Sequence, residues 1–331
     1  MTCDLGEDCQ YVSVSFGYNC EFYILHCLGP GVPYSILRST RTDLNMVLED
    51  NADLKEHLEQ KAISKPEYSL VDTHDGAKVW VRVFLPPTLN KEHIVIYPLL
   101  VHVYGGPGSQ QVTFRFRLGW DAYLSSSQKI IIVQVDGRGS GARGQKYLHS
   151  IYKQLGTLEV QDQITAVRNL TNTYPFIDKE RCAIWGWSYG GFVTSHVMGD
   201  PSKVITCGIA VAPVTDWRYY DSAYSEKYMG LAADNFRGYD NANVSRKAAN
   251  IRGKNLMLIH GTADDNVHFQ HTAQFIRALM EADVDFRVHV YTDKKHSIAG
   301  GNTRKHLYRT MTRYLQRHCW NGGVPRDRTK S

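Results

Sequence analysis

A serine between two glycines is the first residue of this sequence whose setting suggests chemistry. Ser188 lies in Gly-Trp-Ser-Tyr-Gly (residues 186–190), after the apolar run 181–185 and before the helix-like run 192–199. A strand that turns sharply into a helix leaves the residue at the turn exposed, close to helix N–H groups that favour negative charge. Small flanking residues permit such a turn. The motif predicts a serine nucleophile, but it also occurs in ordinary turns, so partner residues must decide.

A serine hydroxyl needs a base that takes its proton and an acid that orients the base. Among the fourteen histidines, His296 lies in a glycine-containing loop just after the last predicted strand. His260 and His102 lie within or at the end of apolar strands, where we expect packed residues. Asp264 follows a predicted strand, although an aspartate there is usually only a turn former. The chain order Ser188, Asp264, His296 is that of α/β-hydrolases.

An oxyanion that develops during acyl transfer needs hydrogen-bond donors. The backbone N–H of Tyr189 follows the predicted nucleophile, which is the usual place for one donor. The loop Val-Tyr-Gly-Gly-Pro-Gly-Ser (residues 103–109) follows a strand, and Tyr104 in it offers a hydroxyl. The alternative is a plain glycine–proline turn, which the spacing fits equally well.

From residue 66 the pattern indicates buried strands separated by helices. Continuous apolar runs that alternate with helical stretches favour a mostly parallel sheet covered on both faces, with active groups at the carboxyl ends of strands. We therefore predict an α/β domain over residues 52–331. The predicted strands are 79–86, 98–104, 129–135, 181–187, 206–212, 255–261 and 286–292, and the longest predicted helices are 158–170, 270–282 and 303–319.

Residues 1–51 have a different pattern. Four short strand-like runs fall within residues 9–50, which is the content of one β-propeller blade. A single blade cannot bury both faces, so the segment is predicted to be the last blade of a truncated propeller. A helix is expected to begin near residue 52, capped by Asn51 or Asp53.

Composition and charge narrow the class of protein. The 331 residues carry a formal net charge of +5 with no long basic run, so we predict no nucleic-acid partner. No apolar stretch is long enough for a membrane helix, and residues 1–10 do not form a signal peptide. Four of seven cysteines precede residue 30, and Asn169 and Asn243 lie in glycosylation sequons. These features predict an extracellular protein whose leader lies outside this sequence.

Longer motifs carry a family resemblance. They are GWSYGG (186–191), LIHGTADDNVHFQ (258–270), CGIAVAPVTDW (207–217), YYDSAYSEKYMGL (219–231) and DGRGSG (136–141). Together they closely resemble the dipeptidyl peptidase IV group of prolyl oligopeptidase-type serine peptidases. The likeness runs from about Cys9 to Cys319 and is far more specific than the serine motif alone.

The resemblance implies an α/β-hydrolase fold and a role for each site residue. Ser188 is the implied nucleophile, His296 the base and Asp264 the orienting acid, with Tyr104 and Tyr189 as oxyanion donors. Asn266 matches a residue that binds the substrate carbonyl. Disulfides are implied for Cys9 with Cys27 and Cys207 with Cys319, and Cys182 is expected to be a buried thiol. The implied pocket for proline or alanine comprises Tyr189, Val214, Trp217, Tyr220, Tyr224 and Val267.

The resemblance also implies an activity, namely release of N-terminal X-Pro or X-Ala dipeptides through an acyl-enzyme on Ser188. No metal or cofactor is implied. The expected assembly is a homodimer formed through the C-terminal region, and the expected location is extracellular, as a secreted protein or a type II plasma-membrane ectodomain. The family's propeller carries paired glutamates that grip the substrate's amino group, and only about one blade is expected here. The alternatives are a truncated or binding-only homologue without catalysis and a broader serine esterase.

Overall fold

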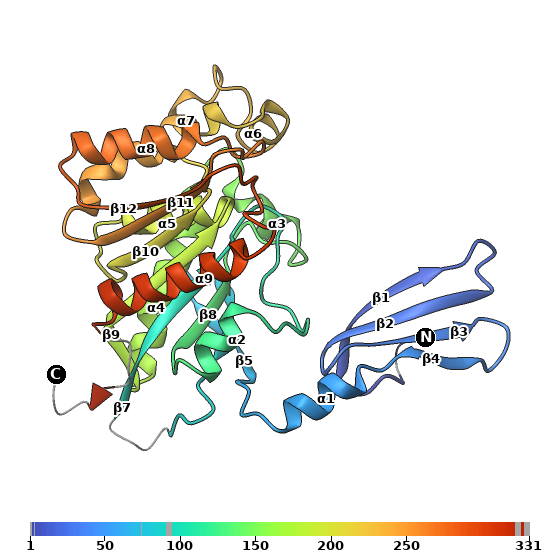
Figure 1. Ribbon diagram of the computed structural model, residues 1–331. Coiled ribbons are helices and arrows are strands. Elements are labelled where there is room, and N and C mark those ends of the chain that lie inside the picture. The colour runs from blue at the N-terminus through green and yellow to red at the C-terminus, as the bar shows by residue number, and fades with distance from the viewer. Residues whose placement is uncertain (1, 3, 74, 91–94, 322–325, 328–331) are drawn as a thin grey trace.

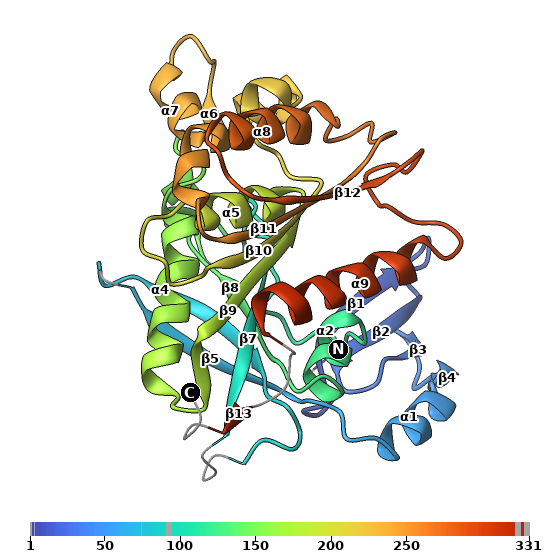
Figure 2. The same ribbon diagram turned by 60° about the vertical axis from the view of Figure 1, so that its left-hand side comes forward.

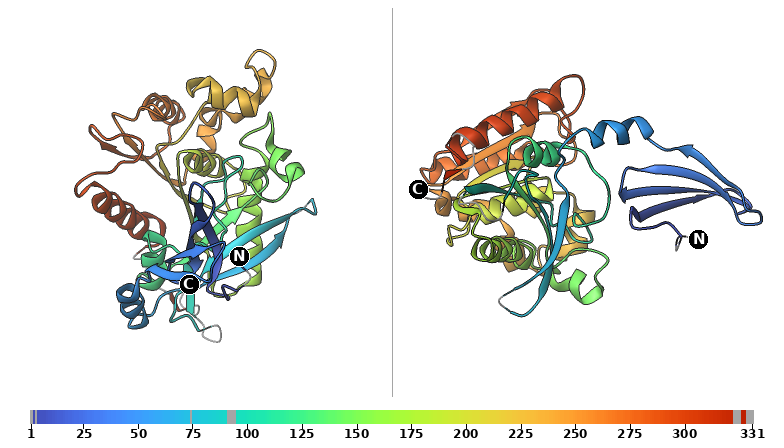
Figure 3. Two further views of the ribbon diagram at one scale, coloured as in Figure 1. Left: turned by 90° about the vertical axis from the view of Figure 1, so that its right-hand side faces the viewer. Right: turned by 90° about the horizontal axis from the view of Figure 1, so that it is seen from below.

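The computed structural model describes residues 2, 4–73, 75–90, 95–321 and 326–327. It contains a small antiparallel sheet near the N-terminus and a larger α/β body (Figure 1). Helix α1 (Ala52–Glu59) lies between the two parts, as the view from below in Figure 3 shows. The proposed domain boundary at residues 51 and 52 coincides with the start of this helix.

The small sheet has the four strands predicted for residues 9–50. They pair antiparallel in chain order and are β1 (Cys9–Phe16), β2 (Phe22–Pro30), β3 (Tyr34–Ser39) and β4 (Asn45–Glu49). Every residue of β4 is exposed, including Met46, Val47 and Leu48. Exposed apolar side chains on an edge strand are unusual in a folded domain. They are expected for a propeller blade whose neighbouring blade is not present.

Helix α1 begins where it was predicted to begin, but its predicted cap is wrong. Asn51 occupies the N-cap position with φ of 52°, and its side chain makes no capping hydrogen bond. Its amide nitrogen instead donates to the carbonyl of Pro33 at 2.8 Å, which ties the helix to the blade. The carboxylate of Asp50 accepts from the N–H of Ala52 at 3.0 Å in its place.

The large sheet is mixed and mostly parallel, as predicted. Its strand order is β12-β11-β10-β9-β7-β8-β6-β5, in which β12 through β8 are mutually parallel and β6 and β5 pair antiparallel. A short strand, β13 (Arg326–Asp327), pairs with β7. The other strands are β5 (Pro66–Asp72), β6 (Lys78–Phe84), β7 (Val95–Val103), β8 (Ile131–Asp136), β9 (Ile177–Trp187), β10 (Cys207–Val211), β11 (Asn255–Gly261) and β12 (Arg287–Tyr291).

Helices cover both faces of this sheet (Figure 2). Alternate residues of β7 show this, because Leu99 and Val101 belong to one core and Leu100 to the other. The first core receives α4 (Leu158–Thr173), α5 (Tyr189–Met198) and α8 (Gln270–Glu281), and the second receives α2 (Trp120–Ser126) and α9 (Thr303–Tyr314). The remaining α-helices are α3 (Gln145–Leu148), α6 (Ser222–Met229) and α7 (Phe236–Ala242). The chain also forms the 3₁₀ helices η1 (His149–Ile151), η2 (Trp217–Tyr219) and η3 (Val244–Ile251) and the π-helix η4 (Leu315–Cys319).

Both implied disulfides are present. Cys9–Cys27 joins β1 to β2, and Cys207–Cys319 joins β10 to η4 beyond α9. Cys182 is a buried thiol, as expected, and burial raises its pKa to about 12. Cys20 is an exposed thiol, and Cys3 lies outside the described residues. Within the described ranges, no helix combines the length and apolarity needed to cross a membrane.

The Cys207–Cys319 bridge closes a segment with a sequence separation of 112 residues, so it restricts the unfolded chain strongly. We expect the paired change Cys207→Ala and Cys319→Ala to lower the free energy of unfolding by about 3–5 kcal/mol in urea titrations. Cys20→Ala, which removes an exposed thiol, is the control and should leave the transition unchanged. Equal stability of the paired variant and the native chain would contradict a structural role for the bridge.

Candidate active site

Ser188 occupies a sharp turn between β9 and α5. Its backbone has φ of 60° and ψ of −116°, which is rare for a residue with a side chain. A Cβ on Gly190 would lie 2.2 Å from the carbonyl oxygen of Val103, and one on Gly186 would lie 2.3 Å from that of Gly190. Only glycine fits at both positions. The flanking glycines therefore let α5 pass directly over the strands, as the sequence predicted.

The turn places Ser188 at the N-terminus of α5. Its own N–H donates to the carbonyl of Val211 at 2.9 Å, which fixes the turn against β10. The N–H groups of the first helical turn, beginning with Tyr189, have no partner inside the helix. The first turn of α5 contains no acidic residue, so its partial positive charge is available to a developing anion.

Asp264 follows β11 at the same edge of the sheet. Its side chain is fully buried. One carboxylate oxygen, Oδ1, accepts from the N–H groups of Asn266 and Val267, both at 3.0 Å. The carboxylate is therefore held by the backbone of its own loop, and its second oxygen is left for other donors.

His296 follows β12 and donates to that second oxygen. Its Nδ1 lies 2.8 Å from Asp264 Oδ2, and its side chain is 23% exposed. Because a carboxylate oxygen only accepts, Nδ1 carries the proton, and the neutral ring then presents Nε2 as a base. Burial by itself raises the pKa of Asp264, but the hydrogen bonds from His260 and His296 outweigh it and hold that pKa well below its usual range.

His260 is a second histidine on the same carboxylate. Its Nε2 lies 2.7 Å from the carbonyl oxygen of Val267 and 3.2 Å from Asp264 Oδ2. Since a carbonyl only accepts, Nε2 carries a proton and serves both oxygens. His260 is fully buried, which confirms the expectation of a packed residue, but its contact with Asp264 was not predicted. The four-residue spacing of the two in one strand-to-turn segment was the available signal.

The loop of His296 is tied to the strand that carries the serine. The indole N–H of Trp187, which directly precedes Ser188, donates to the carbonyl of His296 at 3.0 Å. Lys295 pairs with Asp265 at 2.7 Å across the two loops. No hydrogen bond joins Ser188 to His296 in the described part of the chain, so the role of His296 as base remains a proposal.

Tyr104 stands at the carboxyl end of β7, beside the serine. Its side chain is 37% exposed, and its ring centroid lies 6.2 Å from that of Tyr189. Burial raises the pKa of Tyr104, so its hydroxyl keeps its proton at neutral pH and can donate. The Tyr104 hydroxyl and the Tyr189 N–H are thus both candidates for oxyanion donors.

Four aromatic rings gather next to the serine and form what we call the aromatic cluster: Tyr189, Trp217, Tyr220 and Tyr224. The rings of Trp217 and Tyr224 stack at 5.5 Å, and Tyr189 contacts Trp217 at 5.5 Å. The hydroxyl of Tyr220 donates to Asn266 Oδ1 at 2.8 Å, which leaves the Asn266 amide N–H groups to donate. The two predicted valines of this pocket, Val214 and Val267, are buried.

Comparisons with known proteins bear on this arrangement. Residues 114–321 match the model of the Prolyl oligopeptidase family. The chain is 47% identical over 320 residues to Dipeptidyl peptidase 4 of Sus scrofa and 46% identical over 321 residues to Prolyl endopeptidase FAP of Mus musculus. Each alignment covers 96% of this chain, but only 41% and 42% of those relatives. The chain therefore spans less than half the length of the curated relatives that it matches.

A solved structure has a similar fold. Porphyromonas gingivalis dipeptidyl peptidase 4 superposes with a TM-score of 0.87 at 36% identity, over 93% of this chain and 43% of that chain. The chain belongs to the prolyl oligopeptidase family. The α/β-hydrolase fold and the resemblance inferred from the motifs are confirmed.

A buried glutamate, Glu159, which no sequence pattern indicated, lies next to the site of this member of the prolyl oligopeptidase family. The hydroxyl of Tyr189 donates to Glu159 Oε1 at 2.8 Å, and the N–H groups of Gly156 and Thr157 donate to the same carboxylate at 2.6 and 3.1 Å. Glu159 is buried, and burial raises its pKa. This hydrogen bond from α4 fixes the ring of Tyr189, the member of the aromatic cluster that directly follows the serine.

The sequon asparagines both use their side-chain nitrogen inside the protein. Asn169 Nδ2 donates to the carbonyl of Asp72 at 2.8 Å, and Asn243 Nδ2 donates to Asp216 Oδ2 at 2.8 Å. A glycan on either residue would take one of the two hydrogens of this nitrogen, and glycosylation stays a prediction. The described residues contain no group of three or more histidine, cysteine or acidic side chains that could hold a metal ion.

The fit of Gly190 generates a stability prediction. Gly190→Ala places a Cβ against the backbone of Val103, which cannot move without disturbing the sheet. We expect a loss of about 1–3 kcal/mol in the free energy of unfolding. The control is Gly119→Ala, where nothing lies within 4 Å of the added Cβ. If the two variants unfold at the same urea concentration, the close approach does not constrain the turn.

Proposed function

We propose that this chain carries the catalytic site of a serine peptidase that releases X-Pro or X-Ala dipeptides from the N-terminus of peptides. The observation that supports this most is the hydrogen-bonded pair of Asp264 and His296, at the same edge of the sheet as the turn that exposes Ser188. The aromatic cluster beside Ser188 would supply the preference for a small ring.

The proposed reaction begins with proton transfer. His296 Nε2 takes the proton of the Ser188 hydroxyl while Oγ attacks the carbonyl carbon of the second substrate residue. Collapse of the tetrahedral intermediate breaks the C–N bond, and the imidazolium returns its proton to the leaving amine. A water molecule then attacks the acyl-enzyme by the same route and releases the dipeptide. Asp264, whose low pKa keeps it ionised, stabilises the imidazolium throughout.

The intermediate's oxyanion would be held by the backbone N–H of Tyr189 and the hydroxyl of Tyr104. Both are neutral donors, and the removal of one such donor typically costs about 100-fold or more in turnover. Glu159 acts here as a positioning residue, because its bond to the Tyr189 hydroxyl fixes the residue that provides the first donor.

The side chain of the second substrate residue would lie against the aromatic cluster, with Val214 and Val267 behind it. Flat rings suit the rigid pyrrolidine of proline and leave room for alanine, but not for a long side chain. The free amide N–H of Asn266 would donate to a substrate carbonyl. These assignments rest on the position of the cluster beside Ser188.

The finer statements on partners and location are also proposals. Peptides with proline or alanine in the second position are the proposed substrates, and a homodimer through the C-terminal region is the proposed assembly. We propose an extracellular location, secreted or as a plasma-membrane ectodomain, because the two disulfides are typical of oxidising compartments.

Labelling with a fluorophosphonate probe tests the nucleophile. The native chain should be labelled, and Ser188→Ala should lose the label completely because the probe forms a bond only with an activated hydroxyl. Ser297→Ala, which removes an exposed hydroxyl next to His296, is the matched control and should label like the native chain. Equal labelling of Ser188→Ala would exclude this serine, and no labelling of the native chain would favour a homologue without catalysis.

A substrate panel tests the specificity. We expect hydrolysis of Gly-Pro-p-nitroanilide with a kcat/KM roughly 100-fold above that of Gly-Leu-p-nitroanilide, which is the discrimination that an apolar pocket can provide. Tyr224→Ala should reduce that ratio and spare the labelling of Ser188. Rapid cleavage of p-nitrophenyl acetate without a preference for Gly-Pro would instead identify a broad esterase.

A further inference from the structure

The segment around the last helix has an unusual charge. Residues 294–320 contain seven lysines and arginines and no aspartate or glutamate. Because the whole chain has a formal net charge of only +5, the rest of the protein is net negative. The positive charge of this protein is therefore concentrated in one segment, although no long run of consecutive basic residues reveals it.

Three of these residues form a line along α9. Lys305, Arg309 and Arg313 follow one another at intervals of four, so they share one face of the helix, with steps of about 6 Å. All three are exposed. We call this line the basic stripe. In sequence, Arg317 continues the same spacing into η4.

The basic stripe destabilises its own helix. Like charges four residues apart repel, and Lys305 lies near the positive end of the helix dipole, where the first turn contains no acid. None of the three makes an ion pair with any residue in the described ranges. An arrangement of this kind is relieved when a ligand brings negative charge.

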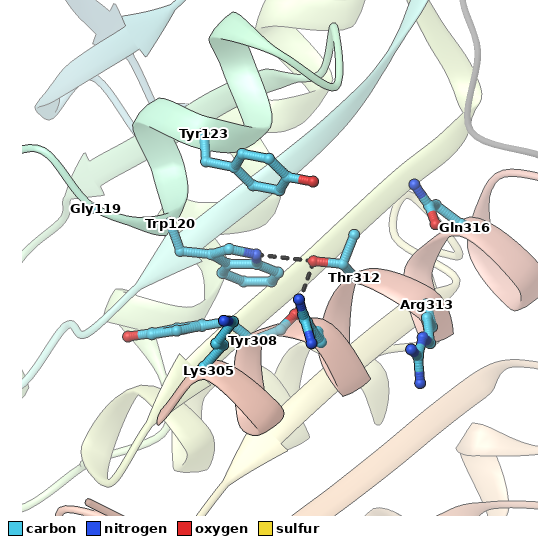
Figure 4. Close-up of a pocket in the computed structure, with 9 residues that line it drawn as sticks. Gly119, Trp120, Tyr123, Lys305, Tyr308, Thr312, Arg313 and Gln316 are labelled. Atoms are coloured by element: carbon cyan, nitrogen blue, oxygen red, sulfur yellow. Dashed lines mark hydrogen bonds between the residues drawn. The ribbon is translucent and has the colours of Figure 1, made fainter. Parts of the chain in front are cut away.

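A groove of about 750 Å³ runs between α9 and α2 beside the stripe (Figure 4). Its lining joins the stripe to aromatic, hydroxyl and amide side chains: Trp120, Tyr123, Tyr308, Thr312 and Gln316.

The floor of the groove is rigid and its rim is open. Trp120 stacks on Tyr308 at 5.3 Å, and its indole N–H donates to Thr312 Oγ1 at 3.0 Å. Tyr123 is 47% exposed, and Figure 4 shows its hydroxyl pointing across the groove toward Thr312 and Gln316. The groove therefore offers a free aromatic face and hydroxyl partners next to a line of cations.

We propose that this groove is a binding site for a linear sulfated polysaccharide. Regular cation steps along one helix suit a chain with repeated negative charges, and guanidinium groups bind oxyanions such as sulfate with paired hydrogen bonds. The exposed ring of Tyr123 can pack against a sugar, and the amide oxygen of Gln316, whose nitrogen donates to Gln128 at 2.9 Å, can accept from the sugar hydroxyls.

Other anionic partners fit less well. A membrane surface is flat, whereas these cations border a groove. A nucleic acid would satisfy the charge, but the two disulfides point to an oxidising compartment, where sulfated polysaccharides are the abundant linear polyanions. A second copy that met this face through a two-fold axis would oppose one basic stripe with another.

Binding of the full chain to immobilised heparin at several salt concentrations tests the proposal. The triple variant Lys305→Glu, Arg309→Glu, Arg313→Glu should bind at least 10-fold more weakly. Its plot of log K against log salt should be shallower by about one unit for each cation removed. The control, Lys55→Glu with Lys61→Glu and Arg237→Glu, makes the same charge change at exposed dispersed sites and should keep most of the affinity.

Further arms separate the remaining explanations. Tyr123→Ala should weaken binding without changing the salt slope, because it removes a ring and no charge. Urea unfolding checks the fold, and the triple glutamine variant at the same positions replaces the glutamate one if that fails to fold. Equal losses in the stripe and control variants, equal binding to desulfated heparin, or tighter binding of polyglutamate or single-stranded DNA would overturn the proposal. So would a switch from dimer to monomer in the stripe variant, which would show that a second copy covers this face.

Discussion

The passage of helix α5 over the carboxyl end of β7 and β9 is the constraint on which the site depends. It exists because Gly186 and Gly190 have no side chain where backbone oxygens would collide with one. The strained backbone of Ser188 is held by that contact and by the bond from its N–H to Val211. The turn thus costs about 1–3 kcal/mol locally and is stabilised by the fit of the whole sheet.

The charge in the site is organised around one carboxylate. Asp264 is fully buried yet ionised, because two backbone N–H groups and two histidines donate to it. Its folded-state pKa lies below the unfolded value, so its contribution to stability is present at neutral pH and is lost only as the pH falls through that low folded value. Because His260 also donates to Asp264, His296 is not the only side chain that stabilises this buried carboxylate.

The sequence predicted what depends on local pattern. The ends of the predicted strands placed Ser188, Asp264 and His296 at one edge of the sheet. The change of pattern near residue 51 falls where the small antiparallel sheet ends and α1 begins. The hydrogen bond of Tyr189 to Glu159 escaped prediction because the two residues lie on different helices. The contact of His260 with Asp264 escaped because a spacing of four residues does not by itself show that two side chains meet. Asn51 has the residue type and the position of a helix cap, but its side-chain amide donates instead to the carbonyl of Pro33 in the small sheet. The basic stripe has a spacing of four residues that the predicted helix 303–319 already implies, but only the structure shows that it borders a groove against α2.

Trp187 connects features that lie apart in the chain. Its indole N–H donates to the carbonyl of His296, and the guanidinium of Arg304, in the first turn of α9, lies over its ring with 5.1 Å to the centroid. Indole emission responds to both kinds of contact. With the other five tryptophans replaced, the emission of Trp187 would therefore report, one residue from Ser188, whether the histidine loop and the start of the last helix keep their places.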